Sequence, residues 1–431
     1  MRRRALIVAL TALLCGAPEA WGQTPPPAGG SAGTAAEAAD LVNTLLGALM
    51  GPVDVTGPQL QREVAEVGGI AFRRDVPIAF MRHDELVAYL REVLDTEYPP
   101  ARAEADERLL QALDLLGPEV DLRGLRARVL EDNVIGFYDE RPGRRQLFAV
   151  SEEQAFTPMN QIVLVHELRH ALQDQYEQLH GQLSEEVGDF DDRRLAWMCL
   201  LEGDATLVME RFVLGRLGAL GLDLPGGMAD QGYADMNIPG LADIPGAPPI
   251  IRDQLVMPYL VGRDLAKAIE ARGGAEAMRE AWRRPPDSTE QVLHPEKFFS
   301  GEPARVVTPH RAPPGGRLLS QGVLGELLLR TLVEETGEAA AGWGGDAWRL
   351  WDVEGRTVLV WKSAWDTVQD AAEFEEALRR RFARRRGSEA QRGAWALFEG
   401  AAGWRFALRR EVDVVDFVSA DAPAAFEALL K

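Results

Sequence analysis

Cysteine is almost absent from this chain of 431 residues, which has only Cys15 and Cys199. A chain with so few thiols cannot build a framework of disulfide bonds, so the packing of apolar residues has to stabilise it. The hydrophobic content of 46% is ample for a core of that kind. Cys199 lies in the apolar run WMCLL, and we interpret it as a buried core thiol because no motif places a base beside it.

Positive charge is also scarce, with 47 Lys and Arg against 67 Asp and Glu and a formal net charge of −20. A chain this acidic lacks the basic surface that nucleic-acid phosphates require, so we expect no nucleic-acid partner. The basic exceptions are two arginine triplets at residues 379–381 and 384–386. We interpret them as the charged end of a helix, where cations complement the helix dipole.

The N-terminus has the pattern of a secretory signal. Three arginines precede an apolar stretch at residues 5–14 that is too short to span a bilayer, and small residues follow at the positions that signal peptidase reads. Residues 1–22 are therefore predicted to be a signal peptide, and the protein to be exported to the periplasm or the extracellular space, with no integral membrane span after its removal. Lipidation of Cys15 is the alternative, although Leu14 is bulky for a lipobox.

The rest of the chain divides by composition. Residues 23–35 are a Pro- and Gly-rich tether that we expect to be disordered. Residues 36–302 are predicted to form a mainly helical domain, and residues 303–431 an α+β region packed on it. Seven of the ten tryptophans fall between residues 343 and 404, for which core packing or a tight β-hairpin is a simpler explanation than an aromatic ligand platform.

Periodicity predicts the elements of the larger domain. Apolar residues three to four apart indicate helices over most of residues 36–133. Two short β-like runs, at residues 134–138 and 146–150, flank the turn signal DERPG and predict an antiparallel hairpin. The Gly- and Pro-rich stretch at 218–250 is too long for a simple connector and is a candidate lid or substrate-binding loop. Further helices are expected at about residues 159–180, 192–217, 251–271 and 274–283.

His166, Glu167 and His170 form an HExxH motif in the helical segment VLVHELRHAL. Four residues of α-helix turn through about 400°, so the two histidines project from one face, one turn apart. Two imidazoles so placed can share one zinc ion, because zinc prefers nitrogen donors in tetrahedral sites. Glu167 is angled to hold a metal-bound water and is our candidate general base. The ordinary alternative is a pair of surface histidines on an unrelated helix.

A catalytic zinc needs a third protein ligand and one open position for water. Our candidate is Glu202, which begins the segment EGDAT inside the helix predicted at 192–217. Competing acids in a looser segment are Glu185, Glu186 and Asp189.

The neighbours of Glu202 have predicted roles of their own. Gly203 would let this helix pack closely on the HExxH helix, which is a physical reason to tolerate glycine inside a helix. Thr206, one turn beyond Glu202, is expected to contact a metal ligand without binding the metal itself. Asp204 is expected to point away from the metal on an ideal helix.

HExxH followed by a downstream E-G-x-A helix resembles the gluzincin branch of zincin metallopeptidases. More closely, the chain resembles a family of poorly characterised exported bacterial zincin-like proteins. The segments that carry the likeness are HELRHALQDQ from His166, LEGDAT from Leu201, STEQVLHPEK from Ser288 and GWGGD from Gly342. The resemblance implies an α+β, mainly helical fold with an active-site helix, a glutamate helix, a small antiparallel sheet and a C-terminal α/β region. It does not supply a substrate.

The implied activity is that of a zinc metallopeptidase. Peptide bonds would be hydrolysed by a zinc-bound water that Glu167 activates. Residues 146–150 are placed like the zincin edge strand that pairs with an extended peptide substrate. Candidate donors to the developing oxyanion are Tyr259 and His294. The remaining histidines, interpreted as surface or locally hydrogen-bonded residues, are His83, His180 and His310.

Arg169 departs from the pattern of this family, which commonly has Thr before the second zinc histidine. It flanks the ligand face, so it need not block the metal. Its charge could lower the pKa of nearby acids, including Glu167, or pair with an acid on a neighbouring helix.

Two other functions remain open. A catalytically weak or inactive zinc-binding protein that acts as a binding or assembly factor at the cell envelope is suggested by Arg169 and the Trp-rich region. A zinc hydrolase acting on another amide is the third.

Overall fold

A computed structural model describes residues 57–154, 156, 158–179, 188–219, 247–309, 312–333, 338–387 and 389–431. The predicted signal peptide, the tether and most of the 218–250 loop lie outside these residues. So do four of the residues weighed in the sequence, His180, Glu185, Glu186 and His310.

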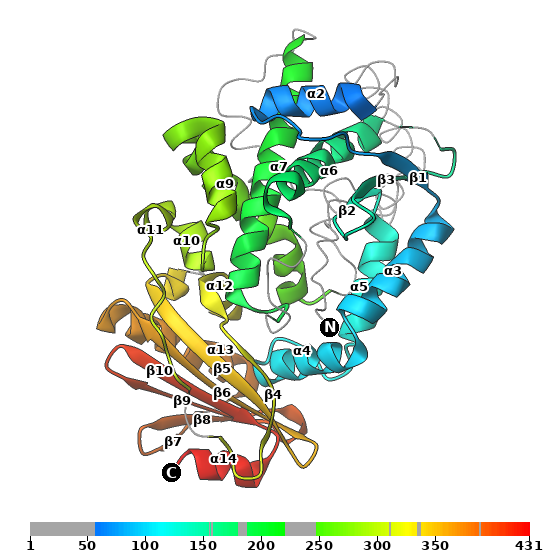
Figure 1. Cartoon of the computed structure of the whole chain (residues 1–431). Helices are drawn as coiled ribbons and strands as arrows, with labels where there is room; N and C mark the ends of the chain where they lie inside the picture. Colours follow the sequence, from blue (N-terminus) through cyan, green and yellow to red (C-terminus); the bar gives the residue numbers. More distant parts are fainter. Residues whose placement is uncertain are drawn as a thin grey trace, which may run out of the picture.

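The chain folds as a mixed α+β protein with its helices and a small sheet at one end and a large sheet at the other (Figure 1). The elements of the first part are α2 (Gly57–Gly68), β1 (Ile78–Met81), α3 (His83–Glu97), α4 (Pro100–Ala112), α5 (Leu122–Asn133), β2 (Gly136–Asp139), β3 (Gln146–Val150), α6 (Pro158–Glu177), α7 (Asp192–Ala219), α9 (Pro249–Arg283), α10 (Thr289–Leu293) and α11 (Pro295–Ser300). Those of the second are β4 (Arg317–Gly322), α12 (Gly325–Val333), η3 (Glu338–Ala340), β5 (Trp343–Val353), β6 (Arg356–Trp365), α13 (Val368–Arg386), β7 (Ala390–Arg392), β8 (Trp395–Glu399), η4 (Ala401–Gly403), β9 (Arg405–Glu411), β10 (Val414–Ala420) and α14 (Pro423–Leu429).

The small sheet has three strands in the order β1-β3-β2. β2 and β3 form the predicted antiparallel hairpin, with Phe137 opposite Phe148. The sheet is not wholly antiparallel, because β1, which periodicity missed inside a helical region, pairs with β3 in parallel. β3 is thus the central strand, and its interpretation as a substrate-binding edge was wrong; β2 occupies the edge beside α6.

α6 packs on the small sheet, α7 packs on α6, and α9 packs on α7. α6 and α7 confirm the two long helices expected from periodicity. α6 buries apolar residues against the sheet and α7, in a cluster that includes Val163, Leu168, Leu147 and Val208. α9 combines the two helices expected at 251–271 and 274–283, and its backbone breaks between them, where Gly274 has a φ of +59°.

α7 and α9 cross with their backbones in contact. A Cβ added to Gly203 would lie 1.9 Å from the carbonyl carbon of Gly262, and one added to Gly262 would lie 1.9 Å from the carbonyl oxygen of Cys199. The close approach expected at Gly203 is therefore present, but with a different partner. Gly203 faces α9, and the expectation that it faces the HExxH helix was wrong. Cys199 is fully buried, as predicted.

The large sheet has seven antiparallel strands in the order β4-β5-β6-β10-β9-β8-β7. One face packs on α13, where Phe374 contacts the ring of Trp361, and the other packs on α14 through Phe426. Trp343, Trp361 and Trp365 are fully buried. The tryptophan-rich region is therefore core packing around the β5–β6 hairpin, as the simpler explanation held.

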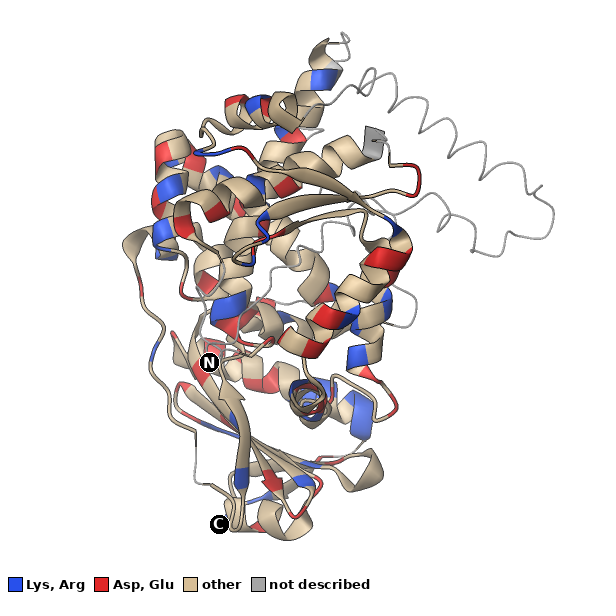
Figure 2. Cartoon of the chain, turned by 45° about the vertical axis from the view of Figure 1, so that its right-hand side comes forward, with Lys and Arg blue, Asp and Glu red and all other residues tan. Residues whose placement is uncertain are grey.

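Ion pairs as well as apolar contacts join the C-terminal region to the N-terminal helices. Three arginines near the end of α13, Arg381, Arg385 and Arg386, converge on Asp114, which follows α4. The arginine triplets do end a helix, as predicted. Acidic and basic residues are interspersed along the helices of the described chain (Figure 2). No helix in the described ranges is long and apolar enough to cross a membrane.

Replacement of Gly203 by alanine is expected to lower the free energy of unfolding by about 1–3 kcal/mol, because the added methyl group has to push two helix backbones apart. Gly215 on the same helix has nothing within 4 Å of an added Cβ. Gly215→Ala should therefore stabilise the protein by about 0.5–1 kcal/mol through helix propensity alone. Urea denaturation of both variants checks this, and equal stabilities would contradict the close crossing.

Candidate metal centre

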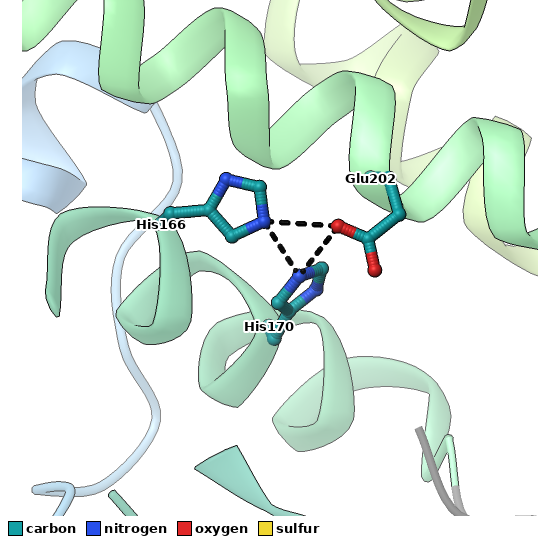
Figure 3. A group of neighbouring side chains, drawn as sticks. All are labelled: His166, His170 and Glu202. Carbon is teal, nitrogen blue, oxygen red and sulfur yellow. Dashed lines mark hydrogen bonds and ion pairs between the residues drawn. The ribbon is translucent and has the colours of Figure 1, made fainter. Parts of the chain in front are cut away.

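Two imidazoles and one carboxylate converge between α6 and α7 (Figure 3). His166 Nε2 lies 3.0 Å from His170 Nε2 and 3.0 Å from Glu202 Oε2, and His170 Nε2 lies 3.3 Å from the same oxygen. The residues are 0%, 2% and 1% exposed. All three of the predicted metal-ligating residues are thus brought together, away from bulk solvent.

Local sequence explains why these side chains meet. His166 and His170 are one turn apart on α6, and the apolar residues between and around them, among them Val165, Leu168 and Ala171, are fully buried. Glu202 lies in the middle of α7, where that helix passes over α6. Since both helices are packed along their length, the three donor atoms are held by rigid elements rather than by loops.

The charges of the three side chains are strongly coupled. Burial lowers the pKa of His166 to about 4. Burial also opposes the charged form of His170, but the Glu202 carboxylate outweighs it and raises the pKa of His170 to about 9. For Glu202, burial favours the neutral acid, yet His170 and His166 bring the pKa down to about 2. The site therefore has a buried carboxylate that requires a cation nearby.

The donor set fits a zinc ion. Ligand atoms at about 2.0–2.1 Å from a tetrahedral zinc lie about 3.3 Å from one another, close to the three separations found here. Within the described structure, Glu202 Oε1 and His166 Nδ1 are buried without a hydrogen-bond partner. Two imidazoles and one carboxylate are also the ligands of many catalytic zinc sites, which leave a fourth position open.

Glu167 lies directly beside the first histidine and is fully buried. Its Oε2 accepts a hydrogen bond of 2.8 Å from the backbone N–H of Tyr138, on the edge strand β2. The hydroxyl of Tyr138 in turn donates to Asp174 of α6, at 3.0 Å. The predicted general base is thus fixed between the HExxH helix and the strand that borders it.

The two candidate oxyanion donors have different surroundings. Tyr259 of α9 is buried, with its ring 5.8 Å from the ring of His166. His294 follows α10, and its Nε2 lies 3.0 Å from Glu326 of α12. That hydrogen bond raises the pKa of His294. The described contacts of the His294 ring are with Glu326 and Glu296 rather than with the three ligands, so of the two candidates Tyr259 is the one beside the site.

Arg169 is fully buried and forms a bidentate ion pair with Asp204 of α7, with Nε and Nη2 each 2.9 Å from a carboxylate oxygen. Its guanidinium also lies over the ring of Trp282, 4.9 Å from the centroid. Of the two expectations for Arg169, pairing with an acid on a neighbouring helix is confirmed. Asp204 points away from the ligands, as predicted, but it has a partner that sequence reasoning did not identify.

Gln173 is the residue of this site that sequence reasoning missed. It lies one turn after His170, its Oε1 is 2.9 Å from His170 Nδ1, and its Nε2 donates to Asp204 at 2.7 Å. The spacing of three residues was the available signal, since i and i+3 side chains share a helix face. A glutamine at that spacing is common on any helix. Its role here becomes visible only from its contact with Asp204, which lies on a different helix.

The remaining candidates lie outside the centre. Asp189, a competing third ligand, pairs with arginines instead, namely Arg102, Arg126 and Arg194. Thr206 is buried, but its hydroxyl has no hydrogen-bond partner in the described structure, so it does not support Glu202 in the expected way. His83 is exposed at the start of α3, as interpreted.

Comparisons with known proteins give one match. Residues 301–430 match the model of a domain of unknown function, DUF8575, which covers the large sheet and its helices but not the metal centre. No curated protein and no solved structure matches the chain.

Replacement of Arg169 by methionine should lower the free energy of unfolding by about 3–5 kcal/mol, because it leaves the buried carboxylate of Asp204 without its partner. Arg193→Met is the matched control on α7, since its ion pair with Asp287 is exposed and should contribute less than about 1 kcal/mol. Urea denaturation with a chelator present excludes any contribution from metal. Similar losses in the two variants would contradict a buried, structural ion pair.

Proposed function

We propose that this protein is a zinc-dependent metallopeptidase with a zincin-like core. His166, His170 and Glu202 hold the zinc, and Glu167 serves as the general base. The observation that carries the proposal is the convergence of three donor atoms 3.0–3.3 Å apart, with a second, non-ligating carboxylate on Glu167, next to His166. A structural zinc site has no need of that second acid, whereas a hydrolytic site does.

A zinc ion in this site would supply Lewis-acid polarisation of a scissile carbonyl and of the attacking water. Glu167 would take the proton of that water on its carboxylate and deliver it to the leaving nitrogen. The N–H of Tyr138 holds Oε2 of Glu167 and so limits the rotation of the carboxylate during the transfer. The burial of the site supports the same chemistry, because electrostatic interactions are stronger where water is excluded.

An extended peptide is the substrate that the surroundings of the site favour. β2 is an edge strand of the small sheet, and the backbone of its residue Tyr138 contacts the proposed base. The four residues of β2 are buried, so a peptide that adds to this edge as a further strand would have to displace the segments that cover it; it would then gain backbone hydrogen bonds and bring a peptide bond towards the zinc ligands. Tyr259, beside His166, is the better placed of the two candidate donors to an oxyanion.

The second candidate is a zinc-binding envelope factor without catalysis. Neither of its two motivating features now favours it, since Arg169 is paired with Asp204 and most tryptophans of the C-terminal region are buried in a core. Export through a signal peptide remains a prediction from the sequence for both candidates.

Replacement of Glu167 by glutamine is expected to leave one bound zinc per chain and to lower the rate of peptide cleavage by a factor of about 10²–10⁴, the usual contribution of a general base. Zinc content by elemental analysis and cleavage of a denatured-proteome peptide library by mass spectrometry are the two measurements.

Glu177→Gln is the matched control, because Glu177 ends the same helix in an ion pair with Arg283 and lies outside the site. It should retain both zinc and activity. If the unsubstituted protein binds zinc but cleaves no peptide in the library, the metallopeptidase proposal is refuted, and the envelope factor and the hydrolase of another amide are the two functions left.

A further inference from the structure

The side-chain amide of Gln173 is fixed at both ends. Its Nε2 donates to the carbonyl oxygen of Leu201 at 3.1 Å and to Asp204 Oδ2 at 2.7 Å. Both of these partners are acceptors, so the NH₂ group of the amide has to face them. The carbonyl oxygen, Oε1, then faces His170 Nδ1 at 2.9 Å.

This orientation selects one tautomer of His170. Because Oε1 of Gln173 is an acceptor, the ring nitrogen beside it has to carry a hydrogen and donate. When His170 binds a metal as a neutral imidazole, the proton leaves the other ring nitrogen, Nε2, whose lone pair then points to where His166 Nε2 and Glu202 Oε2 also meet. A lone pair at Nε2 is what a metal ligand requires.

Arg169 binds Asp204, which in turn binds Gln173, the partner of His170. Its guanidinium occupies both oxygens of Asp204 and is confined by the ring of Trp282 and by Gly68 at the end of α2. A Cβ at Gly68 would lie 2.6 Å from Nη1 of Arg169, so only glycine leaves room for it. Asp204 is thus kept as a charged acceptor in a fully buried position.

We infer that Arg169, Asp204 and Gln173 form a relay of positioning residues that orients His170 for zinc, a role that rests on the metal site proposed above. Arg169, which departs from the family pattern that the sequence resembles, would then help to hold the site together by fixing Asp204, and would not weaken it. The relay acts on one histidine alone, since His166 Nδ1 has no hydrogen-bond partner in the described structure.

The test is zinc affinity in the absence of any substrate. The protein is stripped of metal and titrated with Zn²⁺ in competition with a chromophoric chelator, and the visible spectrum of the Co²⁺ form reports the ligand geometry. Gln173→Leu removes the contact with His170. Gln175→Leu is the matched control, because Gln175 is a buried glutamine on the same helix that binds the backbone of Arg73 and Arg74.

Gln173→Leu should bind zinc about 10–100-fold more weakly and change the Co²⁺ spectrum, as the loss of an outer-shell partner does elsewhere. Gln175→Leu should stay within about twofold of the unsubstituted protein. Unchanged affinity and spectrum in Gln173→Leu, or an equal loss in Gln175→Leu, would overturn the relay.

Asp204→Asn tests the contact between Asp204 and Gln173. It also provides a second test of the relay if Gln173→Leu does not fold. An amide at position 204 can donate as well as accept, so only the Leu201 carbonyl still requires the NH₂ group of Gln173, and the preference of His170 for one tautomer is weakened. We expect weaker zinc binding, although residue 204 touches no ligand. Affinity equal to that of the unsubstituted protein would overturn the role of Asp204 and Arg169. If the unsubstituted protein binds no zinc, the metal centre itself is refuted.

Discussion

Three consecutive residues in the middle of α7 determine where its neighbours lie. Successive residues of an α-helix point about 100° apart, so Glu202, Gly203 and Asp204 face three directions. Glu202 meets the histidines of α6, Gly203 touches the backbone of α9, and Asp204 binds Arg169. A shift of α7 large enough to break one of these contacts would disturb the other two. The three candidate metal ligands, the helix that carries Tyr259 and the buried ion pair are therefore one packing unit.

Buried charge is unusually prominent around this unit. Arg169 pairs with Asp204, and Arg263 of α9 pairs with Glu210 of α7, at 2.5 and 2.8 Å, both inside the core. Buried pairs contribute little net stability when compared with apolar residues, but they penalise any arrangement that separates them. They can therefore fix the relative positions of α6, α7 and α9 more strictly than apolar contacts would. A metal site with three ligands on two helices depends on such strict positioning.

Sequence predicted the elements better than their contacts. The spacing of His166 and His170 is a property of one helix, so local periodicity was enough to predict that they share a face. Glu202 was chosen from its place in a predicted helix with small neighbours, and the resemblance of its short segment agreed with that choice. The partner of Gly203, the pairing of β1 with β3 and the contact between Gln173 and Asp204 all join segments far apart in the chain. Such contacts follow from crossing angles and strand order, which residue periodicity does not determine.

The central claim is that one zinc ion lies between α6 and α7. Anomalous diffraction at the zinc absorption edge, from crystals grown with stoichiometric zinc, tests it most directly. The account predicts a single peak about 2.0–2.1 Å from Nε2 of both His166 and His170 and about 2.0–2.2 Å from a carboxylate oxygen of Glu202. No peak between these residues, or one whose ligands do not include Glu202, would contradict it.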